Sequence, residues 1–186
     1  MAKVYFIDMH MSSRENISSK IKKLFYKLEV NSIINEKDFV AIKTHFGEYG
    51  NIAYLPPAII RAFVDCVKDL KANPFITDAN TLYRGSRSNA IDHLKNAEMN
   101  GFSIFSCGAP VIIADGLRGN DFKEIPASGK WYSSVKVASA IHDADSMIVV
   151  SHVKGHELYG FGGAIKNIAM GCAPPSMKQS LHSDLK

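Results

Sequence analysis

The chain has few cysteines, and their scarcity limits its metal and redox chemistry. Three occur in 186 residues, at Cys66, Cys107 and Cys172, and none belongs to a C-x-x-C pair. The paired spacing used by zinc ribbons and thioredoxin-like sites is therefore missing. Three isolated thiols also fall short of the four that normally hold an iron–sulfur cluster. We expect all three cysteines to be reduced and unpaired in the folded chain.

Signals for membranes, secretion and nucleic acids are also missing. No uninterrupted apolar run approaches the ~20 residues that a transmembrane helix needs. The opening residues lack the pattern of a secretory signal, so we expect a cytoplasmic location. The net charge is only +4, and the basic cluster between Lys20 and Lys27 is typical of the solvated face of a helix. We therefore expect neither a membrane nor a nucleic acid as partner.

Hydrophobic periodicity predicts strands that alternate with helices. Strands are expected over four apolar segments, residues 3–8, 39–44, 73–80 and 147–150. Helices are expected over residues 13–30, from Pro56 to Leu70, and over 88–99, 135–142 and 164–170. This alternation predicts an α/β fold, a three-layer α/β/α domain with a mostly parallel central sheet. The domain is expected to occupy residues 1–173, followed by a polar tail, residues 174–186, with no apolar face to bury.

Local signals predict where helices begin and which sides they bury. Ser12 opens a Ser-x-x-Glu pattern, which predicts a capping box for the first helix. In the helix over 88–99, Ser88 is expected as the N-cap, with Ile91 and Leu94 facing inward. Cys66 lies beside the apolar stripe of the second helix and is expected to pack in the core.

A glycine-rich stretch follows the last expected strand. Polar side chains crowd residues 151–157, and three glycines come next, at Gly160, Gly162 and Gly163. Glycine lets a backbone approach a ligand closely, and the N–H groups that open helix 164–170, together with Lys166, suit an anion. Two common phosphate motifs, G-x-x-x-x-G-K-[ST] and G-x-G-x-x-G, are absent. Gly171 is expected to cap this helix at its C-terminal end. The alternative is that Gly160, Gly162 and Gly163 only allow close packing of the helix on the strand, with Lys166 exposed to solvent.

Polar side chains also follow three expected strands where each one ends. The sets are Thr44, His45 and Glu48; Asp78, Asn80 and Arg84; and Ser151, His152, Lys154 and His156. Because parallel strands have their carboxyl ends along one edge of a sheet, the sets are expected to share a crevice. His45, Asp78 and His152 should then lie at the same edge. The alternative is that such polar loops occur in every α/β domain and bind nothing.

Two kinds of chemistry are open to the imidazole groups. His152 and His156 are four residues apart, but Gly155 and the preceding strand argue against a helix that would align them. His45 or Glu48 from the neighbouring strand could complete a transition-metal site. Without a metal, His45, His152 or Lys154 could transfer a proton. Histidine titrates near neutrality, and burial can tune the pKa of a lysine. Histidines that are only hydrogen-bonded or solvated are the remaining alternative.

The segment from Ser151 to Ala173 resembles the domain-of-unknown-function family numbered 362 (DUF362). The residues that carry the resemblance are Lys154, His156, Gly160, Ile165, Lys166 and Asn167. Two later segments, Gly171–Pro174 and Lys178–Lys186, resemble the iron–sulfur centre branch of that family. The resemblance implies that the tail leads into a ferredoxin-like segment with [4Fe-4S] clusters, and that this chain is the N-terminal portion.

Two functions follow as expectations, and the residues do not decide between them. One is a ligand-binding domain of a ferredoxin-linked redox protein, with a small anionic ligand and an electron-transfer partner. The other is a metal-dependent enzyme that uses histidines at the carboxyl edge of the sheet. The expected ligand-binding residues are Thr44, His45, Asp78, Asn80, Arg84, His152, Lys154, His156, Gly162, Gly163, Lys166 and Asn167.

Overall fold

A parallel sheet lies at the centre of the computed structural model, which describes residues 3–156 and 160–183. The strands of this sheet are β3 (Val111–Ile113), β2 (Asn73–Asp78), β1 (Phe39–Lys43) and β6 (Ser146–Val149), in that spatial order. Every neighbouring pair is parallel. The carboxyl ends of the four strands therefore lie along one edge of the sheet, as expected from the sequence.

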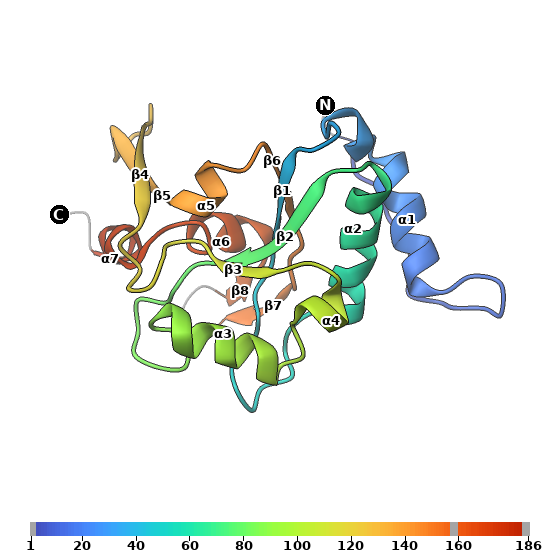
Figure 1. Cartoon of the computed structure of the whole chain (residues 1–186). Helices are drawn as coiled ribbons and strands as arrows, with labels where there is room; N and C mark the ends of the chain where they lie inside the picture. Colours follow the sequence, from blue (N-terminus) through green and yellow to red (C-terminus); the bar gives the residue numbers. More distant parts are fainter. Residues whose placement is uncertain (1–2, 157–159, 184–186) are drawn as a thin grey trace.

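Helices cover both faces of the sheet (Figure 1). One face carries α1 (Ile17–Lys27), α2 (Pro57–Asp69) and the short α4 (Ile104–Cys107). The other face carries α5 (Ser139–His142), α6 (Ala164–Ala169) and α7 (Pro175–His182). One further helix, α3 (Ala90–Met99), packs beside β3. The predicted three-layer α/β/α fold with a mostly parallel sheet is confirmed.

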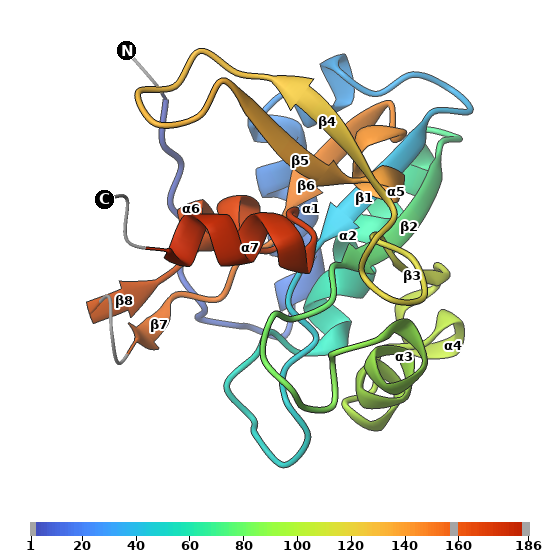
Figure 2. The same ribbon diagram turned by 90° about the vertical axis from the view of Figure 1, so that its left-hand side faces the viewer.

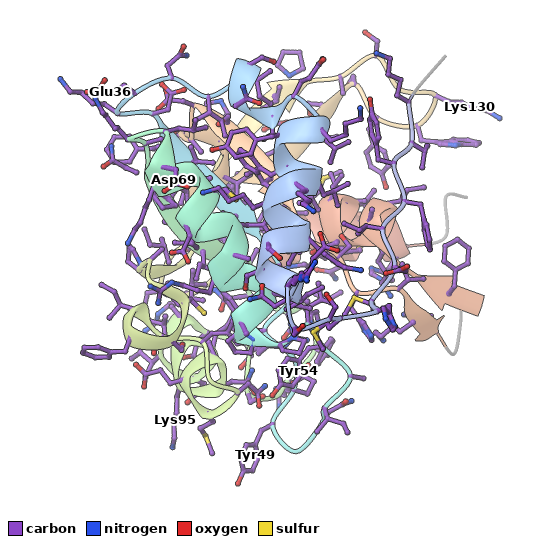
Figure 3. The ribbon with its side chains drawn as sticks, turned by 90° about the vertical axis from the view of Figure 1, so that its right-hand side faces the viewer. Glu36, Tyr49, Tyr54, Asp69, Lys95 and Lys130 are labelled. Carbon is purple, nitrogen blue, oxygen red and sulfur yellow. The ribbon has the colours of Figure 1, made fainter. Side chains whose placement is uncertain are left out.

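The larger hydrophobic core lies between the sheet and the α1–α2 layer. Phe25 of α1, Ile42 of β1, and Ile60 and Val64 of α2 are all completely buried in it. Burial of a side chain of this size stabilises the fold by about 1.5–3 kcal/mol. Figure 3 views this layer from outside and shows α1 beside α2, with Asp69 at the end of α2. Cys66 is 2% exposed within this core, as predicted.

The core on the opposite face is built from smaller side chains. Its buried members are Ala79, Ala114, Ala138, Ile141 and Cys172. Ala79, which follows β2, also lines the pocket described below. Alanine fills little volume, so this face of the sheet can support a cavity where the other face is solidly packed.

Two antiparallel hairpins flank the α5–α7 layer (Figure 2). The first pairs β4 (Phe122–Pro126) with β5 (Ser134–Ala138), and Figure 3 shows Lys130 at its outer turn. Its Tyr132 hydroxyl donates to the Ser180 carbonyl of α7 across 2.7 Å. The second pairs β7 (Lys154–His156) with β8 (Gly160–Gly162), where an irregular loop was expected. Residues 157–159, which join these strands and include Glu157 of the predicted polar crowd, lie outside the described residues.

The start of the chain differs from the prediction. Residues 3–8 form no strand, and the side chains of Val4 and Phe6 are each 90% exposed. Ser12 does not cap α1, because residues 12–15 close a small turn of their own, in which Ser12 N donates to Glu15 O. The N-cap is Asn16, whose side chain accepts from the backbone N–H of Ser19. The helix is therefore shorter than the predicted 13–30.

The inward face of α3 was also predicted wrongly. Asn89, not Ser88, is the N-cap, and its side chain accepts from the backbone N–H of Asp92. Ile91 is 68% exposed. The residues that α3 buries are His93, Asn96 and Ala97. Apolar periodicity pointed to the wrong side because the buried side of this helix is largely polar.

Further corrections concern the basic cluster and two later segments. Residues 135–142 are not one helix, because they divide between the end of β5 and α5. The predicted polar tail contains α7, which buries Met177 and Lys178. Lys20 does not face solvent with the rest of its cluster; it is 6% exposed and lies 2.5 Å from Asp8. Within residues 3–156 and 160–183, no helix has the length and apolar content needed to cross a bilayer.

Candidate functional site

A pocket of about 530 Å³ opens at the carboxyl ends of the parallel strands. His45 follows β1, Asp78 ends β2 and His152 follows β6, and all three line this pocket. The prediction that they meet at one edge of the sheet is confirmed. The β7–β8 hairpin, α6 and α7 supply much of the remaining wall. A space of this size falls in the usual range for a small-molecule site.

Nine of the twelve predicted residues line the pocket. They are His45, Asp78, His152, Lys154, His156, Gly162, Gly163, Lys166 and Asn167. Thr44 and Asn80 are buried behind the wall, 1% and 0% exposed. Arg84 is exposed and does not line the pocket. The neighbouring Arg87 lines it instead.

A completely buried ion pair lies beneath the pocket. The Lys43 ammonium, at the end of β1, is 2.9 Å from Asp78 Oδ1 and also donates to Asn167 Oδ1 at 2.5 Å. The side chains of Lys43 and Asp78 are 0% and 4% exposed. Burial alone would raise the pKa of Asp78, but Lys43, His93 and Arg87 outweigh it and hold that pKa well below its usual range. Asp78 is therefore a carboxylate near neutral pH.

Arg87 joins the same carboxylate to a second acidic group. Its Nη1 lies 3.4 Å from Asp78 Oδ2, and its Nε donates to Glu48 at 2.9 Å. Tyr83 donates to Glu48 at 2.6 Å and accepts from Arg87 at 2.5 Å. Burial tends to raise the pKa of Glu48, but hydrogen bonds from Arg87 and Tyr83 lower it overall. These contacts fix the loop after β2 against the loop after β1.

Two histidines beside Asp78 are neutral, the partly buried His45 and the buried His93. Burial, aided by Arg87, lowers the pKa of His45 to about 4. Burial likewise lowers the pKa of His93 to about 4, despite the nearby Asp78 carboxylate. The backbone N–H of Gly47 donates to His45 Nδ1 at 2.9 Å, so the proton of the neutral ring belongs on Nε2. His45 therefore offers a neutral donor at the pocket wall.

Positive charge is concentrated on the hairpin and α6. Lys154 of β7 is exposed, while Lys166 of α6 is partly buried and contacts His156 Nε2. Burial and the charge of Lys154 lower the pKa of Lys166. Because α6 has only six residues, the positive potential of this wall comes from the side chains more than from a helix dipole.

Gly171 makes room for Lys43 and does not cap α6. The C-cap of that helix is Met170. A β-carbon at position 171 would lie 2.1 Å from the Asn167 carbonyl oxygen and 2.5 Å from Lys43 Nζ. Only glycine fits between the helix and the buried ammonium.

Lys178 of α7 also lines the pocket. It is 7% exposed, and its ammonium donates to the main-chain carbonyl of Asn80. Asp115, completely buried, accepts from the backbone N–H of Asn80 at 3.0 Å and from its side-chain amide at 2.9 Å. Burial lowers the pKa of Lys178 to about 8 and raises that of Asp115 to about 6.

The described residues do not form either metal site considered from the sequence, the histidine site for a transition metal or the iron–sulfur cluster. Among the described residues, no group of three histidine, cysteine or acidic side chains is placed to hold a metal ion. His45, His152 and His156 share the pocket without forming such a cluster. The three cysteines are free, as predicted; they are buried in α2, in α4 and between α6 and α7, and they do not assemble the thiolates of a [4Fe-4S] cluster.

Sequence reasoning missed three charged residues of the site. Lys43 ends a segment that otherwise has the composition of a buried strand. A charged residue at the end of such a strand was the signal that could have identified it as part of the site. Arg84 and Arg87 occupy one loop, and nothing in their spacing distinguishes the one that turns inward. Lys178 was assigned to the tail because it has few apolar neighbours in the sequence.

Comparison with known proteins connects the pocket residues to one family. No curated protein and no solved structure matches it. The sequence profile described as "Domain of unknown function (DUF362)" matches residues 40–186. That span contains β2, β3, β6, all of β1 except Phe39, and every residue assigned above to the pocket. The chain therefore belongs to the DUF362 family.

Proposed function

We propose that the pocket binds a small anionic ligand. The supporting observation is the sign of its charge: the wall includes Arg87, Lys154, Lys166 and Lys178. Asp78 is the one acidic side chain among the described residues that line it, and Lys43 neutralises that carboxylate. A phosphate or carboxylate would meet several cationic donors and one neutral donor, His45. A hydrogen bond to a charged group contributes about 1.5–3 kcal/mol.

Calorimetric titration with pyrophosphate and citrate tests this proposal. Lys166→Ala should weaken binding by about 10- to 100-fold, since each 1.4 kcal/mol corresponds to a factor of ten. Lys27→Ala is the matched control, because Lys27 is exposed in the last turn of α1 and does not line the pocket. Equal affinity in both variants, or no measurable binding at low salt, would refute an anion site.

We further propose that the chain is the ligand-binding domain of a cytoplasmic, ferredoxin-linked protein of the iron–sulfur branch. The support is the resemblance of segments Gly171–Pro174 and Lys178–Lys186, and the clusters would lie outside this chain. Iron and sulfide analysis of this chain, beside a longer product in which a ferredoxin-like segment follows it, tests the proposal. Iron and sulfide only in the longer product support it. Stoichiometric zinc or nickel in this chain would instead support the metal-dependent enzyme.

A further inference from the structure

We propose that Lys178 is a reactive amine that forms an imine with an anionic carbonyl compound bound in the pocket. The ligand class is an aldehyde or a 2-oxo acid that carries a phosphate or carboxylate group. The anionic group would bind Lys154 and Lys166, and the carbonyl carbon would meet Lys178, which lines the same pocket. This inference rests on the proposed anion binding and specifies its ligand.

The position of Lys178 separates it from the other lysines near the pocket. Lys43 is held by Asp78 beneath the wall, while Lys154 and Lys166 belong to the hairpin and α6. Lys178 projects from α7, lines the pocket and donates to a neutral acceptor, the Asn80 carbonyl. None of the ion pairs between described residues involves Lys178. Its nitrogen is thus confined without being committed to a carboxylate.

Burial also makes this amine available as a nucleophile. With the pKa of Lys178 lowered to about 8, roughly one amine in ten is neutral at pH 7. An ordinary lysine with a pKa near 10.4 has roughly one neutral amine in 2,500 under the same conditions. Desolvation in a pocket is an established way to activate a lysine for carbonyl chemistry.

Asn80 and Asp115 act on this amine as positioning residues. Asp115 fixes both the backbone N–H and the side-chain amide of Asn80, whose carbonyl accepts from Lys178. Pro175 of α7 packs beside Gly119, close to Asp115. The amine is therefore held between two rigid attachments, one in the loop after β2 and one in α7.

The step balances without an oxidant or a reductant. The neutral Lys178 nitrogen attacks the carbonyl carbon, which forms a C–N bond and breaks the C=O π bond. A proton moves from nitrogen to oxygen to give a carbinolamine. Protonation of its hydroxyl and loss of one water then give the protonated imine. The alternative is that Lys178 only attaches α7 to the Asn80 carbonyl.

Reductive trapping with pyridoxal 5′-phosphate and cyanoborohydride at pH 7, read by peptide mass spectrometry, distinguishes these roles. Lys178 should be labelled at least 10-fold faster than any other lysine of the chain. Lys178→Arg keeps a cationic donor for the Asn80 carbonyl but cannot form an imine, so it should fold normally and lose the dominant label. Labelling spread evenly over the lysines, or unchanged total labelling in Lys178→Arg, would overturn the proposal.

A second comparison separates this proposal from the anion site on which it rests. Pyridoxal lacks the phosphate, so its trapping at Lys178 should be at least 10-fold slower, and Lys166→Ala should slow the phosphate form alone. Pyrophosphate has no carbonyl group, so its binding to the wild type, measured by calorimetry, reports the anion site without imine formation. Retained pyrophosphate binding without Lys178 labelling in the wild type refutes the imine and leaves the anion site standing.

Discussion

Replacing Lys43 by methionine should be among the most destabilising single substitutions in the chain. Methionine keeps much of the side-chain length but removes the ammonium that lies 2.9 Å from Asp78. Removing one partner of a buried pair costs about 3–5 kcal/mol, because the remaining charge is left without compensation. Arg87 still approaches Asp78 at 3.4 Å, so we expect about 3 kcal/mol, the lower end of that range.

Urea denaturation at pH 7 measures this cost, and Lys71→Met provides the control. Lys71 pairs with Glu36 at 3.8 Å, but its side chain is 75% exposed, so its loss should cost less than about 1 kcal/mol. If Lys43→Met lowers the free energy of unfolding no more than Lys71→Met does, the buried pair does not stabilise the fold as proposed. Adding Asp78→Asn to Lys43→Met should cost less than the sum of the two single losses, because the same interaction is removed twice.

The pair also predicts how stability depends on pH. The pKa of Asp78 is lower in the folded chain than its usual value of 3.8, so the unfolded chain takes up the proton first. Its contribution is complete above about pH 4 and is lost as the pH falls through the folded pKa. In Lys43→Met the folded pKa of Asp78 rises toward its unfolded value, because the strongest lowering influence is gone, so the acid loss should be smaller and should end at a higher pH. An unchanged acid transition would contradict the assignment.

Three more outcomes are expected. Gly171→Ala should cost at least about 2 kcal/mol through overpacking against Lys43 and the Asn167 carbonyl, whereas Gly155→Ala, with nothing within 4 Å of the added carbon, should leave thermal unfolding nearly unchanged. Burial lowers the pKa of both His45 and His93 from 6.5 to about 4. The unfolded chain therefore takes up protons first, and the free energy of unfolding should decline as the pH falls from about 6.5 to 4. His45→Gln should flatten that decline in pH-dependent unfolding. Thiol titration under denaturing, non-reducing conditions should find three free cysteines, and finding one would reveal a disulfide.

The parts predicted well from the sequence are those that chain order and short-range periodicity determine. The apolar run from Phe39 and the proline-started helix after Pro56 are local patterns, and both elements formed as expected. Parallel strands place their carboxyl ends together, so His45, Asp78 and His152 could be grouped without knowing any distance. Side-chain direction inside loops is not a local property, and Arg84 was therefore chosen where Arg87 turns inward.

The wrong predictions share a physical cause: the structure that a local sequence pattern adopts depends on residues elsewhere in the chain that contact it. Residues 3–8 have strand composition, but a strand also needs a neighbour to pair with, and none of the described strands accepts them. His93 of α3 is buried because Asn80 lies within hydrogen-bonding distance of its ring, which its apolar neighbours in the sequence do not reveal. Lys178 is likewise buried where its ammonium donates to the carbonyl of Asn80, almost 100 residues earlier in the chain.

The position of α7 in the pocket wall determines where purification handles should be attached. His182, the last residue of α7, lines the pocket, and a tag fused after Lys186 would begin only four residues beyond it. A polyhistidine sequence there would bring imidazole groups and adventitious nickel close to Lys178, and both would distort metal analysis and anion titration. A tag fused ahead of Met1 would not continue from α7, which comprises residues 175–182. Removable N-terminal handles are therefore the sound choice for every binding experiment on this chain.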